Sequence, residues 1–307
     1  GGVKKAMEFF SLFTSNFVHY FKELWLTLLL GFFLSGIFYQ FFPTEKVQQY
    51  LGQKGFKSIL FASIIGAFLP VCCIGTLPIA LTLRRKQASL GAVMAFLVAT
   101  PATSITALFV CWKLLGLAFT ILTFFGAILM GIVVGIICDG INSKPEAHVH
   151  EKSCCHHEEE EPIGKTYQEK FQRSLVYAFI TLPKKIGVEI IFGMALSSFI
   201  LSFQPIQQFI KGYLSGLIGY AVIIIFGLVT YVCSTGDVPI AHALVKAGMS
   251  QGHALCYLLV GPVTSYSTIL VIHKEFGKHV LVVYLFSIVS ISFLFGILTD
   301  LYLHQVI

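Results

Sequence analysis

Eight long apolar segments constrain most strongly what this chain can fold into. They cover residues 24–42, 58–83, 88–112, 114–138, 186–203, 214–232, 249–271 and 280–303. A helix needs about 20 apolar residues to cross a bilayer, and each segment is close to that length. Of the 307 residues, 56% are hydrophobic and only 12% are charged, which excludes a soluble enzyme, a disordered tail protein and a disulfide scaffold. We predict an all-α polytopic membrane protein.

The first four segments and the last four are copies of one another. A shift of 161 residues aligns 71–104 with 232–265 without a gap, and 13 of the 34 positions are identical. This duplication predicts three parts: an N-terminal transmembrane repeat (1–139), a polar linker rich in His, Cys and Glu (140–174) and a C-terminal transmembrane repeat (175–307). Internal duplication of this kind is usual in secondary transporters.

Gly and Pro interrupt equivalent apolar segments in both copies. A proline removes a backbone N–H and frees a carbonyl that lipid cannot satisfy, so such breaks are expected only where they are buried or beside a polar cavity. Hydroxyl side chains that suit a ligand or a freed carbonyl follow the later prolines. We therefore predict a binding site at the repeat interface, with helix breaks at Gly75, Pro78, Pro101, Gly236, Pro239 and Pro262 and hydroxyls at Thr103, Ser104, Thr264 and Ser265.

Asp237 is a carboxylate inside an apolar stretch, four residues after Cys233. Burying a charge there costs on the order of 3 kcal/mol or more, so such an acid is by default a proton relay or a cation ligand. A solvated loop position is the alternative. Cys72, Cys73 and Cys233 converge if the two repeats pack about a pseudo-two-fold axis. Thiolates select soft ions such as Cu(I), Zn(II) or trivalent arsenic, whereas a buried thiol can also serve as a small apolar side chain.

Other Cys and His residues of the apolar segments suggest packing and not chemistry. Cys111, Cys138 and Cys256 lack the symmetric context, so we assign them to the core. His242, His253, His273 and His279 are isolated along the sequence, and we expect each to have an ordinary structural role.

The linker contains the tract HVHEKSCCHHEEEE at residues 148–161. Imidazole and thiolate bind zinc and copper, so the tract is expected to collect metal, although its spacing fits no closed zinc finger. A solvated, disordered charge run is the competing interpretation. The predicted linker ligands are His148, His150, Cys154, Cys155, His156 and His157.

The chain carries no ATP-binding motif, because Glu159 occupies the position of the first glycine of a phosphate loop. Transport must then use an ion gradient or the gradient of the substrate, and Asp237 is the candidate for proton coupling. Positive charges fit two topologies. Eight full spans place fourteen Lys or Arg inside and seven outside; re-entrant hairpins at 58–83 and 214–244 place fifteen inside and six outside. Both put the linker in the cytoplasm.

The segment PVCCIGTLPIALTLRRKQASLGAVMAFLVATPATS and its partner CSTGDVPIAHALVKAGMSQGHALCYLLVGPVTS resemble bacterial heavy-metal and metalloid efflux permeases. That family includes organoarsenical efflux permeases, and the second motif is most similar to its copper/zinc branch. The resemblance covers nearly the whole chain. It implies export of a thiophilic metal or metalloid from the cytoplasm, with Cys72, Cys73 and Cys233 as the matching thiols. The branch usually reads Cys-x-Cys-Gly, so the second thiol is displaced here, and whether Cys73 faces the site stays open.

We therefore expect a gradient-driven secondary transporter of the bacterial inner membrane that is not an enzyme and has no resident cofactor. Its partners are the metal or metalloid ion and the bilayer; nucleic acid is excluded because the 21 Lys and Arg flank the spans and form no basic face. A single chain or a homodimer could form the unit. The alternative is a membrane thiol-disulfide electron carrier that uses Cys72 or Cys73 with Cys233.

Overall fold

The structure is a computed structural model that describes residues 2–41, 55–69, 73–85, 88–140, 182–203, 216–230 and 233–306, with the single positions 180, 208 and 210. Within these ranges every regular element is a helix, so the all-helical prediction is confirmed for this part of the chain. Most of the predicted linker lies outside the described residues, and the three-part division of the chain stays a prediction.

The helices of the described residues fall into two sets of six. The first set is α1 (Gly2–Phe41), α3 (Phe56–Phe68), α4 (Cys73–Arg85), α5 (Leu90–Ala102), α6 (Ile105–Leu115) and α7 (Leu117–Asp139). The second set is α9 (Leu182–Ser202), α11 (Leu217–Val229), α12 (Ser234–Lys246), α13 (Gln251–Val260), α14 (Tyr266–Glu275) and α15 (Lys278–Val306).

The bounds of these helices follow the offset found in the sequence. Helices α3, α4, α5, α6 and α7 begin at residues 56, 73, 90, 105 and 117, and α11 to α15 begin at 217, 234, 251, 266 and 278, which is 161 residues later in every case. The local signals recur as well. Ser104 and Ser265 each cap the following helix, and Gly116 and Gly277 have φ angles of 93° and 86°, a conformation that favours glycine at the tight turns before α7 and α15.

The two central helices are α5 and α13. All 13 residues of α5 and nine of the ten residues of α13 are buried. Helix α5 packs against α3, α4 and α7, and α13 packs against α11, α12 and α15. A helix that is apolar on every face is expected in the interior of such an assembly, so the core is built around these two helices.

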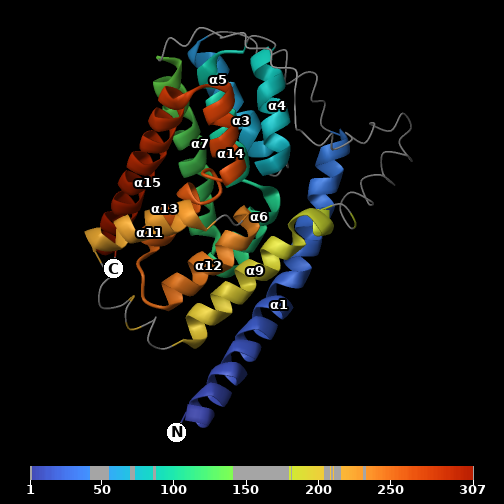
Figure 1. Cartoon of the computed structure of the whole chain (residues 1–307), viewed down its shortest axis with the longest axis vertical. Helices are drawn as coiled ribbons and strands as arrows, with labels where there is room; N and C mark the ends of the chain where they lie inside the picture. Colours follow the sequence, from blue (N-terminus) through green and yellow to red (C-terminus); the bar gives the residue numbers. More distant parts are fainter. Residues whose placement is uncertain are drawn as a thin grey trace.

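Helices α7 and α15 pack together and run in opposite directions. In Figure 1, α7 (green) runs upward and α15 (dark red) runs downward. Side chains near the start of α7 and near the end of α15 line one groove of about 580 Å³, and Ser292 near the middle of α15 lies 3.5 Å from the sulfur of Met130 in α7. In this one pair of helices, positions 161 residues apart therefore lie on antiparallel helices.

Two described helices are long and apolar enough to cross a membrane, Leu117–Asp139 and Lys278–Tyr302. The pair α5 and α6, bent by 47° at its break, counts as a third if it forms one span. Helices α3 and α11 are apolar but have only 13 residues each, or about 20 Å at 1.5 Å per residue. This is shorter than the hydrocarbon thickness of about 30 Å, so neither helix crosses a bilayer by itself.

Candidate functional site

Cys233 and Asp237 lie one turn apart at the start of α12. Cys233 is the N-cap residue, in extended conformation, and its carbonyl accepts hydrogen bonds from the N–H groups of Gly236 (2.8 Å) and Asp237 (3.0 Å). The cysteine is 7% exposed and the aspartate is fully buried. Asp237 is therefore buried, as its position inside an apolar stretch predicted, and the alternative of a solvated loop position is wrong.

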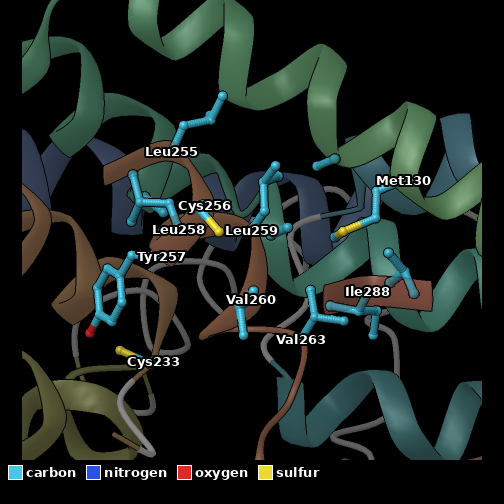
Figure 2. Packing of buried hydrophobic residues seen from close by; sticks show 14 of the residues in the cluster. Met130, Cys233, Leu255, Cys256, Tyr257, Leu258, Leu259, Val260, Val263 and Ile288 are labelled. Carbon is cyan, nitrogen blue, oxygen red and sulfur yellow. The ribbon is translucent and has the colours of Figure 1, made fainter. Parts of the chain in front are cut away.

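The carboxylate of Asp237 is held by α13. The hydroxyl of Tyr257 donates to Asp237 Oδ1 at 2.7 Å, and its oxygen lies 3.3 Å from the hydroxyl of Thr230, which follows α11. A Cβ at Gly261 would lie 3.1 Å from Asp237 Oδ2, so glycine leaves room for the carboxylate. Figure 2 shows the Tyr257 ring with its hydroxyl directed to the side where Cys233 lies. The result is a polar group to which three helices contribute, with the Asp237 carboxylate and the Tyr257 ring fully buried.

The described residues of the first half contain no equivalent of this polar group at the positions aligned with it. The positions 161 residues earlier hold Leu69, Thr76, Phe96 and Thr100, all of them buried. None of these side chains supplies a carboxylate or a phenol hydroxyl. Asp237, Tyr257 and Thr230 thus all differ in type from the residues aligned with them in the first half. The acid, its hydrogen-bond donor and the next hydroxyl occur together in the second half.

The start of α12 is also a contact between the two halves. The hydroxyls of Ser104 and Ser234 lie 2.9 Å apart, and those of Thr106 and Thr235 lie 3.0 Å apart. On its other side α12 packs on α9, where a Cβ at Gly193 would lie 2.5 Å from the carbonyl oxygen of Gly236. Helices α6, α9 and α13 therefore enclose the first turn of α12.

The four predicted hydroxyls satisfy backbone groups. Thr103 donates to the carbonyls of Ala99 and Ala67, at 2.7 and 3.1 Å, and Thr264 donates to Val260 at 2.9 Å. Ser104 and Ser265 accept from backbone N–H groups as N-caps of α6 and α14. Of the two predicted roles, ligand contact and satisfaction of freed carbonyls, the structure shows the second for Thr103 and Thr264. Capping by Ser104 and Ser265 was not predicted, and Ser104 also meets the start of α12.

The helix breaks lie beside several of the predicted residues and not at them. Gly75 and Pro78 lie inside α4, Pro101 lies inside α5, and Gly236 and Pro239 lie inside α12. Of the predicted set, Pro262 occupies the turn between α13 and α14. A proline six residues into a helix removes one hydrogen bond without ending it. The described chain leaves helical conformation instead at Leu69, at Thr103–Ser104 and at Thr230 and Cys233.

The structure brings together only part of the predicted metal ligands. Cys72 and all six linker ligands (His148, His150, Cys154, Cys155, His156 and His157) lie outside the described residues, and Cys73 is described only as the first residue of α4. Within the described ranges no three His, Cys, Asp or Glu side chains converge on one point. Cys111, Cys138 and Cys256 are buried free thiols, as expected for core positions.

Sequence reasoning missed Tyr257 and Thr230. The sequence contained a sign of both residues, because Tyr257 aligns with Phe96 and Thr230 aligns with Leu69 at offset 161. A hydroxyl group at a buried position needs a hydrogen-bond partner, and Asp237 is the partner of the Tyr257 hydroxyl. His253 was also assigned an ordinary role, and its surroundings are described below.

Comparison with known proteins places these observations in a family. The description "Predicted permease" (ArsP_1) matches residues 5–301. A relative from Streptococcus mutans, provisionally named a two-component membrane permease complex subunit, is 25% identical over 81% of this chain and 82% of its own. The UPF0718 protein MJ0584 of Methanocaldococcus jannaschii is 23% identical over 91% of this chain and 92% of its own. The UPF0718 protein YraQ of Escherichia coli is 22% identical over 84% of this chain and 72% of its own. No solved structure matches. The chain belongs to the ArsP_1 family of predicted permeases, a description that indicates membrane transport.

Proposed function

We propose that this permease exports a thiophilic metal or metalloid ion, of the copper, zinc or trivalent arsenical class, through a site at the start of α12. One observation carries the proposal: a buried thiol and a buried carboxylate, Cys233 and Asp237, lie one helical turn apart where the two halves meet. A thiolate binds soft ions, and an acid in the membrane interior binds protons or cations. Cys72 and Cys73 are the proposed further thiols.

Proton coupling is the proposed energy source. A buried carboxylate is costly as an ion and gains stability when a proton or a cation arrives. Tyr257 donates a hydrogen bond to Asp237, which stabilises the ionised form after the proton has left. Alternation between the two forms would let Asp237 exchange a proton for each ion released from Cys233.

The antiparallel run of α7 and α15 favours one of the two topologies. Helix α7 ends and α15 begins at the same end of the molecule (Figure 1), so the chain between them crosses the membrane an even number of times. Eight full spans would require three crossings there, whereas re-entrant hairpins at 58–83 and 214–244 require two. In this topology the linker is cytoplasmic. A metal-collecting tract on that side supports export across the inner membrane.

Metal content of the purified protein is the decisive test. We expect a near-stoichiometric soft metal or arsenical in the wild type after anaerobic loading and its loss in the double variant Cys72→Ser/Cys233→Ser. Cys256→Ser is the matched control, because that thiol is equally buried but packs in the core. Absence of metal together with a reversible Cys72–Cys233 disulfide would refute metal export and support the function of an electron carrier.

Direction and coupling are tested in vesicles of known orientation. We expect uptake of Zn(II), Cu(I) or a trivalent arsenical into inverted vesicles that is stimulated by a proton gradient. Asp237→Asn should keep metal binding and lose this stimulation, whereas Asp139→Asn, which changes a carboxylate at the end of α7, should keep both. Uptake only in right-side-out vesicles would overturn export, and a gradient response retained in Asp237→Asn would remove Asp237 from coupling.

A further inference from the structure

A second buried polar cluster joins α11, α13 and α15. Asp300 of α15 accepts hydrogen bonds at Oδ2 from the hydroxyls of Tyr220 (2.6 Å) and Ser250 (2.5 Å), and at Oδ1 from the N–H of Gly252 (2.8 Å). His253 lies 2.5 Å from Ser250 Oγ through Nδ1 and 3.1 Å from the carbonyl of Gly216 through Nε2. The His253 ring stacks on Tyr220 at 3.9 Å and its side chain is only 3% exposed.

The donors and acceptors of these contacts define the arrangements of protons that fit the cluster. The carbonyl of Gly216 can only accept, so Nε2 of His253 carries a proton. The single hydroxyl proton of Ser250 is donated to Asp300, and Ser250 Oγ must therefore accept from Nδ1, which then carries a proton as well. In this arrangement both ring nitrogens carry a proton, and Nδ1 of the ring lies 3.7 Å from the Asp300 carboxylate.

The same contacts allow one other placement of that proton. Asp300 can hold it and donate to Ser250, which then donates to Nδ1 of a neutral His253 ring. One O–H bond forms at Asp300 while one N–H bond breaks at His253, and Ser250 exchanges its own proton between them. In both arrangements the cluster contains one proton more than a neutral histidine beside an ionised aspartate.

Loss of this proton leaves one of the two side-chain contacts of Ser250 without a hydrogen atom. With a neutral ring and an ionised carboxylate, Ser250 has one proton for two acceptors that each lie 2.5 Å away. One of those contacts would then join two lone pairs, which is repulsive at that distance. The side chains that the proton holds together belong to the start of α13 and the end of α15.

The first half contains the capping residues of this cluster but neither its histidine nor its tyrosine. Asp139 accepts from the N–H of Gly91 at 3.1 Å, as Asp300 does from Gly252, and Ser89 caps α5 as Ser250 caps α13. The positions of Tyr220 and His253 are taken by Ile59 and Ala92. The aspartate therefore serves as a cap in both halves, and only the second half adds an imidazole and a phenol to it.

We propose that His253, Ser250 and Asp300 form a proton-binding site that takes up one proton, with Tyr220 as a further donor to the carboxylate. Imidazole is the side chain that gains and loses protons near physiological pH, and the 29% exposure of the Asp300 side chain gives the site access from outside the core. The site lies where α15 ends and α7 begins, at the opposite end of the molecule from the end of α7 (Figure 1).

The groups around the site come from every helix that packs on α13. Helix α11 contributes Tyr220, α15 contributes Asp300, and α13 itself contributes the Cys256 thiol one turn away. Helix α7 meets α13 through an apolar contact of Gly126 with Leu259. On the α12 side, Tyr257 binds the carboxylate of Asp237, and Tyr257 follows His253 by four residues on the same face of α13. The two clusters of the second half thus share one helix.

The test counts protons on the full-length protein in lipid nanodiscs, without any metal. Magnetic resonance with ¹⁵N-labelled histidine, assigned by His253→Gln, should show both nitrogens of His253 protonated at neutral pH. If the ring is neutral, a protonated-carboxyl infrared band that disappears in Asp300→Asn would equally support the site. A neutral ring beside an ionised Asp300 would overturn the proposal. Contact with the stacked Tyr220 ring provides the assignment if the glutamine variant does not fold.

A matched pair of variants separates proton binding from helix capping. Asp300→Asn keeps an acceptor for Gly252 but loses the charge, so proton binding at His253 should weaken about tenfold or more. Asp139→Asn removes the same charge from the equivalent cap and should leave the His253 titration unchanged. An equal effect of both variants, or of neither, would refute the site. Because no transport is measured, failure of the proposed permease activity would not affect this result.

Discussion

The contact of α9 with α12 can be tested by a single methyl group. In Gly193→Ala, the new Cβ would lie 2.5 Å from the carbonyl oxygen of Gly236 and 2.9 Å from its carbonyl carbon and Cα. Ordinary van der Waals contact begins near 3.4 Å, so the two helices must separate by about 0.5–0.9 Å. Both partners are backbone in the first turn of α12, and no flexible side chain can move aside. Overpacking of this kind typically costs about 1–3 kcal/mol.

Gly187→Ala is the control on the same helix, because a Cβ at Gly187 has no atom within 4 Å. It should leave stability unchanged or raise it by up to about 1 kcal/mol through helix propensity. We expect the unfolding midpoint of Gly193→Ala in detergent to fall by roughly 2–10 °C relative to Gly187→Ala. Thermal unfolding followed by circular dichroism, at matched detergent and scan rate, measures the difference. Equal midpoints for the two variants would refute the close approach of α9 and α12.

Three further changes have defined outcomes. Tyr257→Phe removes the donor to Asp237 and should cost about 1–3 kcal/mol of stability while shifting the pH dependence of transport, as measured by unfolding and by vesicle assays. Ser104→Ala removes the α6 cap and the contact with Ser234, and should cost about 1 kcal/mol in the same unfolding assay; no change would mean that the cap is dispensable. Deletion of 148–161 should slow export at low metal concentration and leave the maximal rate unchanged, so complete loss would show that the tract is obligatory.

Much of the architecture can be read from the printed residues. Apolar segments identify a helical membrane protein because each helix satisfies its own backbone in lipid. The alignment at offset 161 anticipates the starts of five helix pairs, since the same caps and turn glycines recur at equivalent positions. The proximity of Cys233 and Asp237 follows from four residues on one helix, which is a local relation.

Predictions about helix breaks were less accurate because they depend on neighbours. Pro239 remains inside α12, where packing against α6, α9 and α13 outweighs the one hydrogen bond that proline removes. His253 seemed an isolated histidine, but Asp300 meets it from 47 residues further along the chain. Nothing local in the sequence distinguishes this histidine from His273, which lies exposed at the end of α14.

The sequence by itself determined the membrane environment, the helical class, the duplication and the residue types able to bind a soft ion, because hydropathy, caps and glycine turns act over a few residues. Only the tertiary structure decided that α7 and α15 are antiparallel, that Tyr257 and Thr230 reach the start of α12, and that His253 joins Asp300. These relations join residues far apart in the chain, and they depend on how whole helices pack, which no local pattern specifies.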